Sequence, residues 1–118
     1  MSKGNNNLFA TISFKIHASL NQKINEKVVS EGKGMRGKGQ WIREAIENFL
    51  DLPDFPELVS LADGYEDADY VLTAKISKSL SLRVEQAVIP IRKEYPEIEG
   101  VKSKIFRTAI IQRLIRVQ

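Results

Sequence analysis

The sequence predicts a mainly α-helical protein with a two-stranded antiparallel β-ribbon, formed by two copies of one strand–helix–helix unit in a single chain. An internal repeat is the first observation behind this prediction: "TISFKIHASL" at 11–20 matches "VLTAKISKSL" at 71–80, at an offset of 60 residues. The second is a short alternation of polar and apolar residues in each copy, which is typical of a half-buried strand. The third is a helical spacing of apolar residues after each alternating stretch.

The strands are expected at 11–16 and 71–76, where the alternation occurs in both copies. Successive side chains of a strand point to opposite faces, so each strand should have one apolar and one polar face. The apolar faces consist of Ile12, Phe14 and Ile16 in one strand and Leu72, Ala74 and Ile76 in the other. The polar faces consist of Thr11, Ser13 and Lys15, with Val71, Thr73 and Lys75 beside them.

The first helix of each unit should follow its strand after a short connection. Apolar residues recur four apart in both copies, at Leu20, Ile24 and Val28 and at Leu80, Val84 and Val88. Ser19 and Ser79 are the expected N-caps, because a serine hydroxyl can accept hydrogen bonds from the first free amides of a helix. Pro90 should kink or stop the second of these helices near Ile89.

The second helices match at a different offset of 64 residues, where "WIREAI" at 41–46 aligns with "IFRTAI" at 105–110. We expect them to begin near Gly39 and near Ser103, after loops rich in glycine, proline or charge. Trp41 could stack on an exposed base. Its spacing with Ala45 and Phe49 instead favours a place in the core.

Residues 51–69 should form an acidic linker, since they include seven Asp or Glu and no Lys or Arg. Pro53 and Pro56 should end the preceding helix, and 58–62 should form a short helical turn. The expected organisation is a flexible N-terminus at 1–8, a first unit at 9–50, the linker at 51–69 and a second unit at 70–118. Both units should form one compact domain.

The two units should pair, because neither is large enough to bury a sufficient core. A lone strand would also leave a row of backbone amides and carbonyls without partners. Both problems disappear if the two strands pair antiparallel above four helices. The apolar strand faces would then point inward and the polar faces outward.

The charge of the chain is distributed unevenly. The net charge is +3, yet outside 51–69 there are 18 Lys and Arg against 8 Asp and Glu. A basic body suggests a polyanionic partner, although uneven surface charge alone would give the same numbers. There is no cysteine, and no apolar run approaches the roughly 20 residues that cross a bilayer. We therefore expect a soluble protein of the cytoplasm or nucleoid, without a membrane partner.

With these elements the sequence resembles the ribbon-helix-helix superfamily of the Arc, MetJ and CopG type. The resemblance covers about residues 9–50 and 70–117, and the second helices, "WIREAIENFL" and "VKSKIFRTAI", carry much of it. The first copy has Gly39 where family members often have Ser or Thr. Two units in one chain are similar to the tandem TraY-type proteins of conjugative plasmids.

The resemblance implies a sequence-selective protein that inserts its ribbon into the major groove of double-stranded DNA. It would act as a transcriptional repressor or as an accessory factor at a plasmid transfer origin, in the relaxosome. The base-reading candidates are Thr11, Ser13, Lys15, Val71, Thr73 and Lys75. All of these residue types are also common on an ordinary exposed strand. Further copies of the protein on adjacent sites and a relaxase or other conjugation protein are the other candidate partners.

The N-termini of the second helices are expected to bind phosphates, because free amides and the helix dipole attract anions there. The glycine-rich loop at 32–39 could approach the DNA backbone closely, or it could be a flexible loop with solvated charges. The phosphate-binding candidates are Arg36, Lys38, Gly39, Gln40, Lys102, Ser103 and Lys104.

A protein-interaction module of the same fold, antitoxin-like or scaffold, is the alternative to DNA binding. An enzyme is not expected, because no Ser-His-Asp, metal-ligand or phosphate-loop spacing is visible and His17 is the only histidine. His17 is expected to be structural or a minor phosphate contact. Asp63, Glu66, Asp67 and Asp69 do not follow calcium-loop spacing, so we expect neither a metal nor a cofactor.

Overall fold

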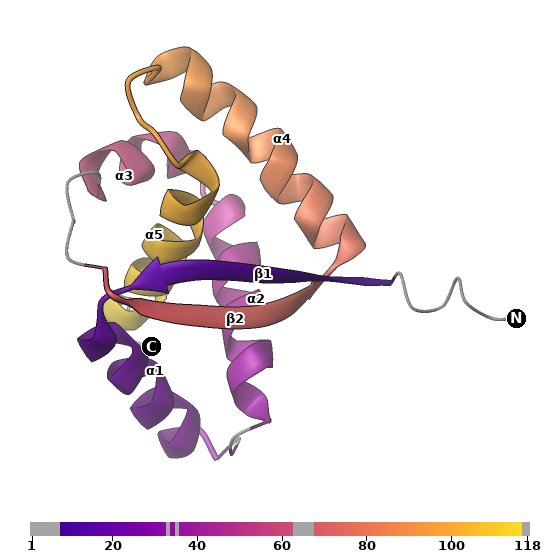
Figure 1. Ribbon diagram of the computed structural model, residues 1–118, viewed down its shortest axis with the longest axis vertical. Helices are drawn as coiled ribbons and strands as arrows, with labels where there is room; N and C mark the ends of the chain where they lie inside the picture. The colour runs from indigo at the N-terminus through magenta and orange to yellow at the C-terminus, as the bar shows by residue number, and fades with distance from the viewer. Residues whose placement is uncertain (1–7, 33, 35, 63–67, 117–118) are drawn as a thin grey trace, which may run out of the picture.

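The computed structural model describes residues 8–32, 34, 36–62 and 68–116. It is mainly helical, with one two-stranded antiparallel sheet, as the sequence predicts. The elements in chain order are β1 (Phe9–Ile16), α1 (Ala18–Ser30), α2 (Gly37–Leu50), α3 (Phe55–Ala62), β2 (Tyr70–Ser77), α4 (Lys78–Glu94) and α5 (Val101–Ile115). In Figure 1 the ribbon crosses α2 and α5, while α1 and α4 lie on opposite sides of it.

The strands β1 and β2 pair antiparallel within the same chain, which confirms the predicted pairing. The register runs from Phe9 opposite Ser77 to Ile16 opposite Tyr70. Ser13 lies opposite Thr73, and these two residues also occupy matching positions in the 60-residue repeat. Their hydroxyl oxygens are 3.0 Å apart and form a hydrogen bond. The centre of the ribbon is therefore the point at which the repeat and the strand register coincide.

The inner face of the ribbon lies on the core, as the alternation predicts. Phe14, Ile16, Leu72, Ala74 and Ile76 are buried, and Ile12 is partly buried against them. The ring of Phe14 packs against the ring of Phe106 from α5, with centroids 5.1 Å apart. Burial of these side chains removes apolar surface from water and holds the ribbon above α2 and α5.

The predicted N-caps of the first helices are wrong by two residues. Helix α1 is capped by His17, whose ring nitrogen Nδ1 accepts from the amide of Ser19 at 3.5 Å, and α4 is capped by Ser77. The hydroxyl of Ser77 accepts from the amide of Leu80 at 3.1 Å. Helix α4 begins directly after β2 and α1 begins one residue after β1, so Ser19 and Ser79 already lie in the first turn.

The second helices also begin two residues earlier than expected, at Gly37 and Val101. The N-cap of α5 is Gly100, with φ 63° in the left-handed region that favours glycine. Neither Gly100 nor Arg36, the N-cap of α2, provides a side-chain hydrogen bond to its helix. The first amides of both helices therefore receive no capping acceptor from these N-cap side chains.

Pro90 has a weaker effect than predicted, whereas α2 ends at Leu50, before Pro53 and Pro56, as predicted. Helix α4 continues past Pro90 to Glu94, so the expected stop near Ile89 is wrong. Pro90 is exposed, and solvent can hydrate the carbonyl that the missing amide leaves without a donor. Pro56 lies in the first turn of α3, where a missing amide is tolerated, and α3 is longer than the predicted turn at 58–62.

Parts of the predicted linker and N-terminus lie outside the described residues, including Asp63, Glu66 and Asp67. At the described end of the linker, a carboxylate oxygen of Asp69 accepts from the amide of Ala18 at 3.3 Å and so helps to cap α1. Within the described residues, no helix combines the length and apolar character needed to span a membrane.

Candidate nucleic-acid interface

The outer face of the ribbon brings together all the base-reading candidates that the sequence predicts. Thr11, Ser13, Lys15, Val71, Thr73 and Lys75 are all exposed. The register arranges them in three rows across the two strands: Thr11 with Lys75, Ser13 with Thr73, and Lys15 with Val71. A two-stranded ribbon with such a face is narrow enough to enter a major groove.

Lys15 and Lys75 lie on either side of the central row, one on each strand. Each is two residues from Ser13 or Thr73, in opposite directions along the ribbon. With a rise of about 3.3 Å per residue, their Cα atoms are about 13 Å apart along the ribbon, which corresponds to about four base-pair steps of 3.4 Å. The two ammonium groups can thus reach different bases.

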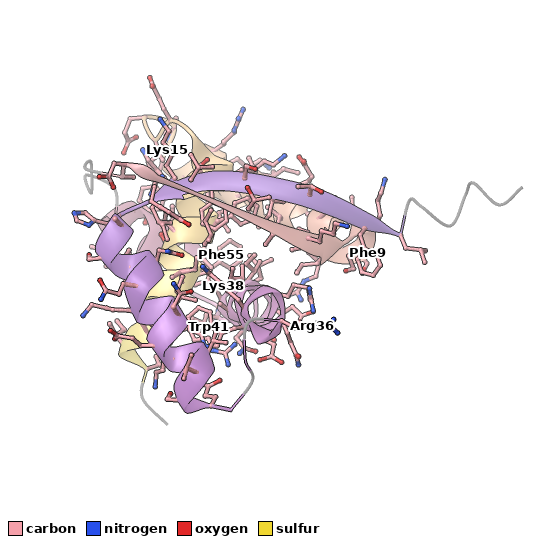
Figure 2. All side chains as sticks on the ribbon, turned by 60° about the horizontal axis from the view of Figure 1, so that its bottom comes forward. Phe9, Lys15, Arg36, Lys38, Trp41 and Phe55 are labelled. Carbon is pink, nitrogen blue, oxygen red and sulfur yellow. The ribbon has the colours of Figure 1, made fainter. Side chains whose placement is uncertain are left out.

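Phe9, which was not among the predicted base-reading residues, lies on the same outer face as they do. Its side chain is 55% exposed, and it is paired with Ser77 at one end of the ribbon. Figure 2 shows Phe9 and Lys15 near opposite ends of the ribbon. The alternation contained the necessary signal, because Phe9 is two residues before Thr11 and must share its face.

Two arginines that were not predicted from the sequence hold the free edges of the ribbon. Arg43 of α2 donates from Nη1 to the carbonyl oxygen of Lys75 in β2, at 3.3 Å. Arg107 of α5 donates from Nη1 to the carbonyl oxygen of Lys15 in β1, at 3.1 Å. The contacts are crossed, since each second helix holds the strand that belongs to the other half of the sequence.

The free edges explain why these carbonyls need an external donor. The carbonyl of Ile16 accepts from the amide of Asp69, so it points towards β2. Successive carbonyls of a strand point to opposite edges, so that of Lys15 points away from β2. Arg43 lies in the second turn of α2 and Arg107 in the second turn of α5. The N-terminal halves of both helices therefore lie beside the two edges of the ribbon.

The lysines at these helix N-termini are held by the preceding helices. The ammonium of Lys38 donates to the side-chain oxygen of Asn21 in α1 at 2.7 Å, and its partial burial lowers its pKa. Lys102 occupies the matching position in α5 and forms an ion pair with Glu85 of α4. Both contacts tie a second helix to the first helix of its own half, so binding of a phosphate by either lysine would require these contacts to be shared or exchanged.

The other phosphate-binding candidates surround the same helix N-termini. Arg36 and Gln40 are exposed, and Gln40 donates to the carboxylate of Glu44 at 2.9 Å. Gly39, Ser103 and Lys104 are partly exposed within the first turns of their helices. The backbone amide of Lys104 already donates to the carbonyl of Gly100 at 3.1 Å. The amides that precede it in α5 are the better candidates for an anion.

Trp41 lies in the core, as predicted, and His17 has a structural position, which is one of the two roles expected for it. Trp41 is fully buried in α2, with the guanidinium of Arg113 from α5 lying 4.7 Å from its ring centroid. His17 caps α1 and contacts the hydroxyl of Ser19 at 3.0 Å. Among the described residues, no group of three His, Cys, Asp or Glu side chains is arranged to hold a metal ion.

Comparisons with protein-family models, with curated proteins and with solved structures find no match to this chain.

Proposed function

We propose that this chain is a sequence-selective double-stranded DNA-binding protein that inserts the β1–β2 ribbon into the major groove. In this proposal the chain is a tandem ribbon-helix-helix protein, in which the two halves of the sequence form a pseudo-dimer. Phosphate contacts from the N-termini of α2 and α5 fix the position of the ribbon, and its outer side chains select the bases.

The crossed contacts of Arg43 and Arg107 are the observation that carries the proposal. A two-fold arrangement of two units requires that every contact from one half has a counterpart from the other half. The two arginines match at an offset of 64 residues, and the carbonyls they hold, those of Lys75 and Lys15, match at 60. The central Ser13–Thr73 pair is where a two-fold axis would cross the ribbon.

The chemistry of the outer face suits base edges. The ammonium groups of Lys15 and Lys75 can donate to guanine O6 and N7, and the methyl groups of Val71 and Thr11 can contact a thymine methyl. The hydroxyls of Ser13 and Thr73 can donate or accept, but a base that uses them must compete with the hydrogen bond between them. The basic excess outside the acidic linker adds a long-range attraction to a polyanion.

The two halves of the outer face are unequal, which favours an asymmetric or direct-repeat site. Thr11 faces Lys75 in one row, while Val71 faces Lys15 in the matching row. Phe9 adds an apolar contact at one end of the face only. On this basis the protein acts as a transcriptional repressor, or as an accessory factor that binds beside further copies of itself and a relaxase at a plasmid transfer origin.

Selection of bound fragments from random double-stranded DNA, followed by substitution of Lys15 and Lys75, tests this proposal. Lys15→Ala and Lys75→Ala should each relax the preference at a different base, about four base pairs apart, with about 1–3 kcal/mol of lost discrimination for a bidentate contact. Binding should weaken steeply with salt, with a log–log slope of about −0.9 per neutralised phosphate.

Lys93→Ala is the matched control, because Lys93 is an exposed lysine in the last turn of α4. It should leave every base preference unchanged. The proposal is wrong if the selection yields no motif, or if binding does not depend on salt. If both ribbon substitutions weaken binding equally on every sequence, the lysines contact phosphates and the base-reading assignment is wrong.

A further inference from the structure

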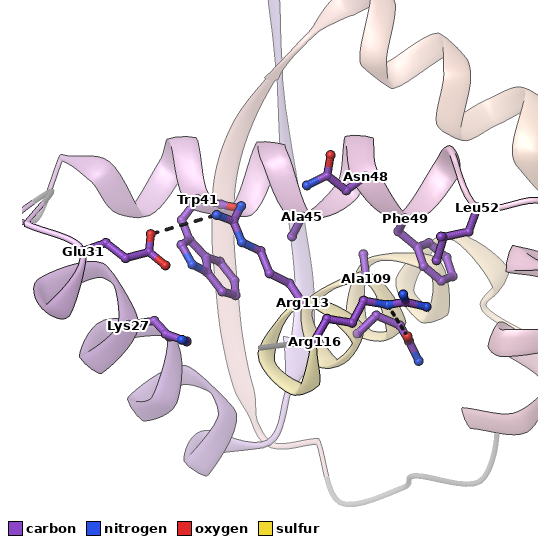
Figure 3. A pocket seen from close by; sticks show the side chains of 11 residues that line it. Lys27, Glu31, Trp41, Ala45, Asn48, Phe49, Leu52, Ala109, Arg113 and Arg116 are labelled. Carbon is purple, nitrogen blue, oxygen red and sulfur yellow. Dashed lines mark hydrogen bonds and ion pairs between the residues drawn. The ribbon is translucent and has the colours of Figure 1, made fainter. Parts of the chain in front are cut away.

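A groove opens between α1, α2 and α5, on a part of the molecule that the proposed DNA contact does not use. Its volume is about 570 Å³. Trp41, Ala45 and Ala109 form its buried floor, and charged side chains from α1 and α5 surround it (Figure 3). We call it the α1–α2 groove.

The corresponding place in the other half of the chain is covered by α3. The repeat matches α1 with α4 and α2 with α5, and α3 packs against both α4 and α5. Val59 of α3 is fully buried there, and the ring of Phe55 lies 6.1 Å, centroid to centroid, from that of Phe49, which also lines the α1–α2 groove. The residues that line the α1–α2 groove come from α1, α2 and α5 and from the residues that follow these helices, and none of them belongs to α3.

The α3 helix also shows which kind of segment suits such a place. It is eight residues long, with Phe55, Leu58 and Val59 turned to the core and Glu57 exposed in the first turn. Apolar residues spaced by three or four positions place one face of a helix on a groove floor. A short helix therefore covers this type of site without a large interface.

The charges around the α1–α2 groove favour an acidic occupant. Lys27, Arg113 and Arg116 line it, against Glu31 as the one acidic lining residue. Arg113 is paired with Glu44 at 3.1 Å and with Glu31 at 4.0 Å, and it also donates to the carbonyl oxygen of Trp41 at 3.0 Å. A partner with carboxylates on its flanks would complement the remaining positive charge.

We propose that the α1–α2 groove docks a short acidic amphipathic helix of a partner protein, in the place that corresponds to α3 in the other half of the chain. The proposal rests on the two-unit arrangement proposed above, but it does not depend on DNA binding.

Trp41 provides both support and a reporter. Its indole Nε1 is buried and has no hydrogen-bond partner within the described part of the chain, and the guanidinium of Arg113 lies against its ring. A helix that docks on this floor changes the surroundings of the ring and of Arg113. Because Trp41 is the only tryptophan of the sequence, its fluorescence reports changes at this one position.

The experiment titrates the full chain with a synthetic peptide of sequence DLPDFPELVSLA, which copies residues 51–62. Saturable change in Trp41 fluorescence is expected, with amide shifts in NMR spectra at Ala45 and Asn48, whereas a peptide of scrambled sequence should give neither. The double variant Lys27→Gln/Arg116→Gln should weaken peptide binding about fivefold, because two rim charges are lost. Lys23→Gln, one turn earlier on α1 and exposed, is the matched control and should change the affinity less than about twofold.

Three outcomes would overturn the proposal. No saturable change in fluorescence means that the groove does not accept such a helix. Amide shifts confined to α4 and to the α3-facing side of α5 mean that the peptide replaces α3 instead. A fluorescence change on concentrating the protein alone means that a second copy occupies the groove. None of these results alters DNA binding, which is measured separately on the same variants.

Discussion

Arg43 and Arg107 show how a two-stranded ribbon can be held firmly at both edges. A ribbon in a larger sheet would find edge partners in neighbouring strands, but here the outward-pointing carbonyls have only side chains or water to bond. A guanidinium is well suited to this position, because it stays charged and its donors lie in a fixed plane. The two contacts fix the distance between the ribbon and the helix N-termini beneath it.

Arg43→Met and Arg107→Met should each lower the free energy of unfolding by about 0.5–1.5 kcal/mol, the usual net contribution of one hydrogen bond. Urea unfolding measures this loss. Arg83→Met is the control, since Arg83 pairs with Asp51 through side chains that are 43% and 68% exposed, and should cost less than about 0.5 kcal/mol. Equal losses for all three variants would show that the carbonyl contacts add nothing.

At the level of single residues, the sequence predicted which side chains point outward but not which contacts fix the backbone. The polar faces follow directly from alternation, and Phe9 could have been included by the same rule. The hydrogen bonds of Arg43 and Arg107 could not be predicted, because an arginine on a helix surface gives no sequence signal for the distant carbonyl that it reaches. The sequence indicated only that the two arginines occupy matching positions in the two copies.

Among the elements, α4 illustrates how strongly a helix start depends on the residue that leaves the strand. Ser77 is the last residue of β2, and its extended backbone lets its hydroxyl reach the amide of Leu80. Ser79 contacts the Ser77 hydroxyl at 3.2 Å from within the first turn. Two serines two residues apart therefore have different roles, and only one of them caps the helix.

Ser77→Ala should destabilise the protein by about 1 kcal/mol, the usual cost of losing an N-cap. Ser79→Ala is the matched control, because its hydroxyl does not accept from a helix amide, and it should cost less than about half as much. Thermal unfolding followed by circular dichroism gives both values. A larger loss for Ser79→Ala would mean that the cap assignment is wrong.

Element order and type were predictable, while boundaries and breaks were not. The spacing of apolar residues predicted α1, α2, α4 and α5, since burial of one face decides their position. The N-caps of α1 and α4 were misplaced by two residues because Ser19 and Ser79 fit a cap by type alone. The chain instead leaves at most one residue between each strand and its helix. Pro90 was expected to kink or stop α4 near Ile89, but its exposed position allows the helix to continue.

For the whole molecule, pairing of β1 with β2 inside one chain removes the need for a second chain to complete the ribbon. The midpoint of thermal unfolding should therefore not change over about a hundredfold range of protein concentration, since mass action affects only association. Differential scanning calorimetry measures it directly. A midpoint that rises with concentration would show that strands are exchanged between chains or that association contributes to stability.

The pairing itself was predictable because neither half has enough core to stand alone, and the repeat supplied a matching strand. The α1–α2 groove was not predictable, since its shape depends on where α3 lies against α4 and α5. The linker sequence indicated a helical turn but not the helices it contacts. Contacts between segments that are distant in the sequence determine such surfaces.

The single-chain ribbon also affects how its outer face can evolve. In an assembly of two identical chains, one codon change alters both halves of a shared surface at once. Here Lys15 and Lys75 are encoded separately, so either can change while the other keeps its contact. Thr11 and Val71, which occupy matching positions, already differ. In a gene of this kind, single mutations can change the base contacts of one half of the outer face while the other half keeps its own.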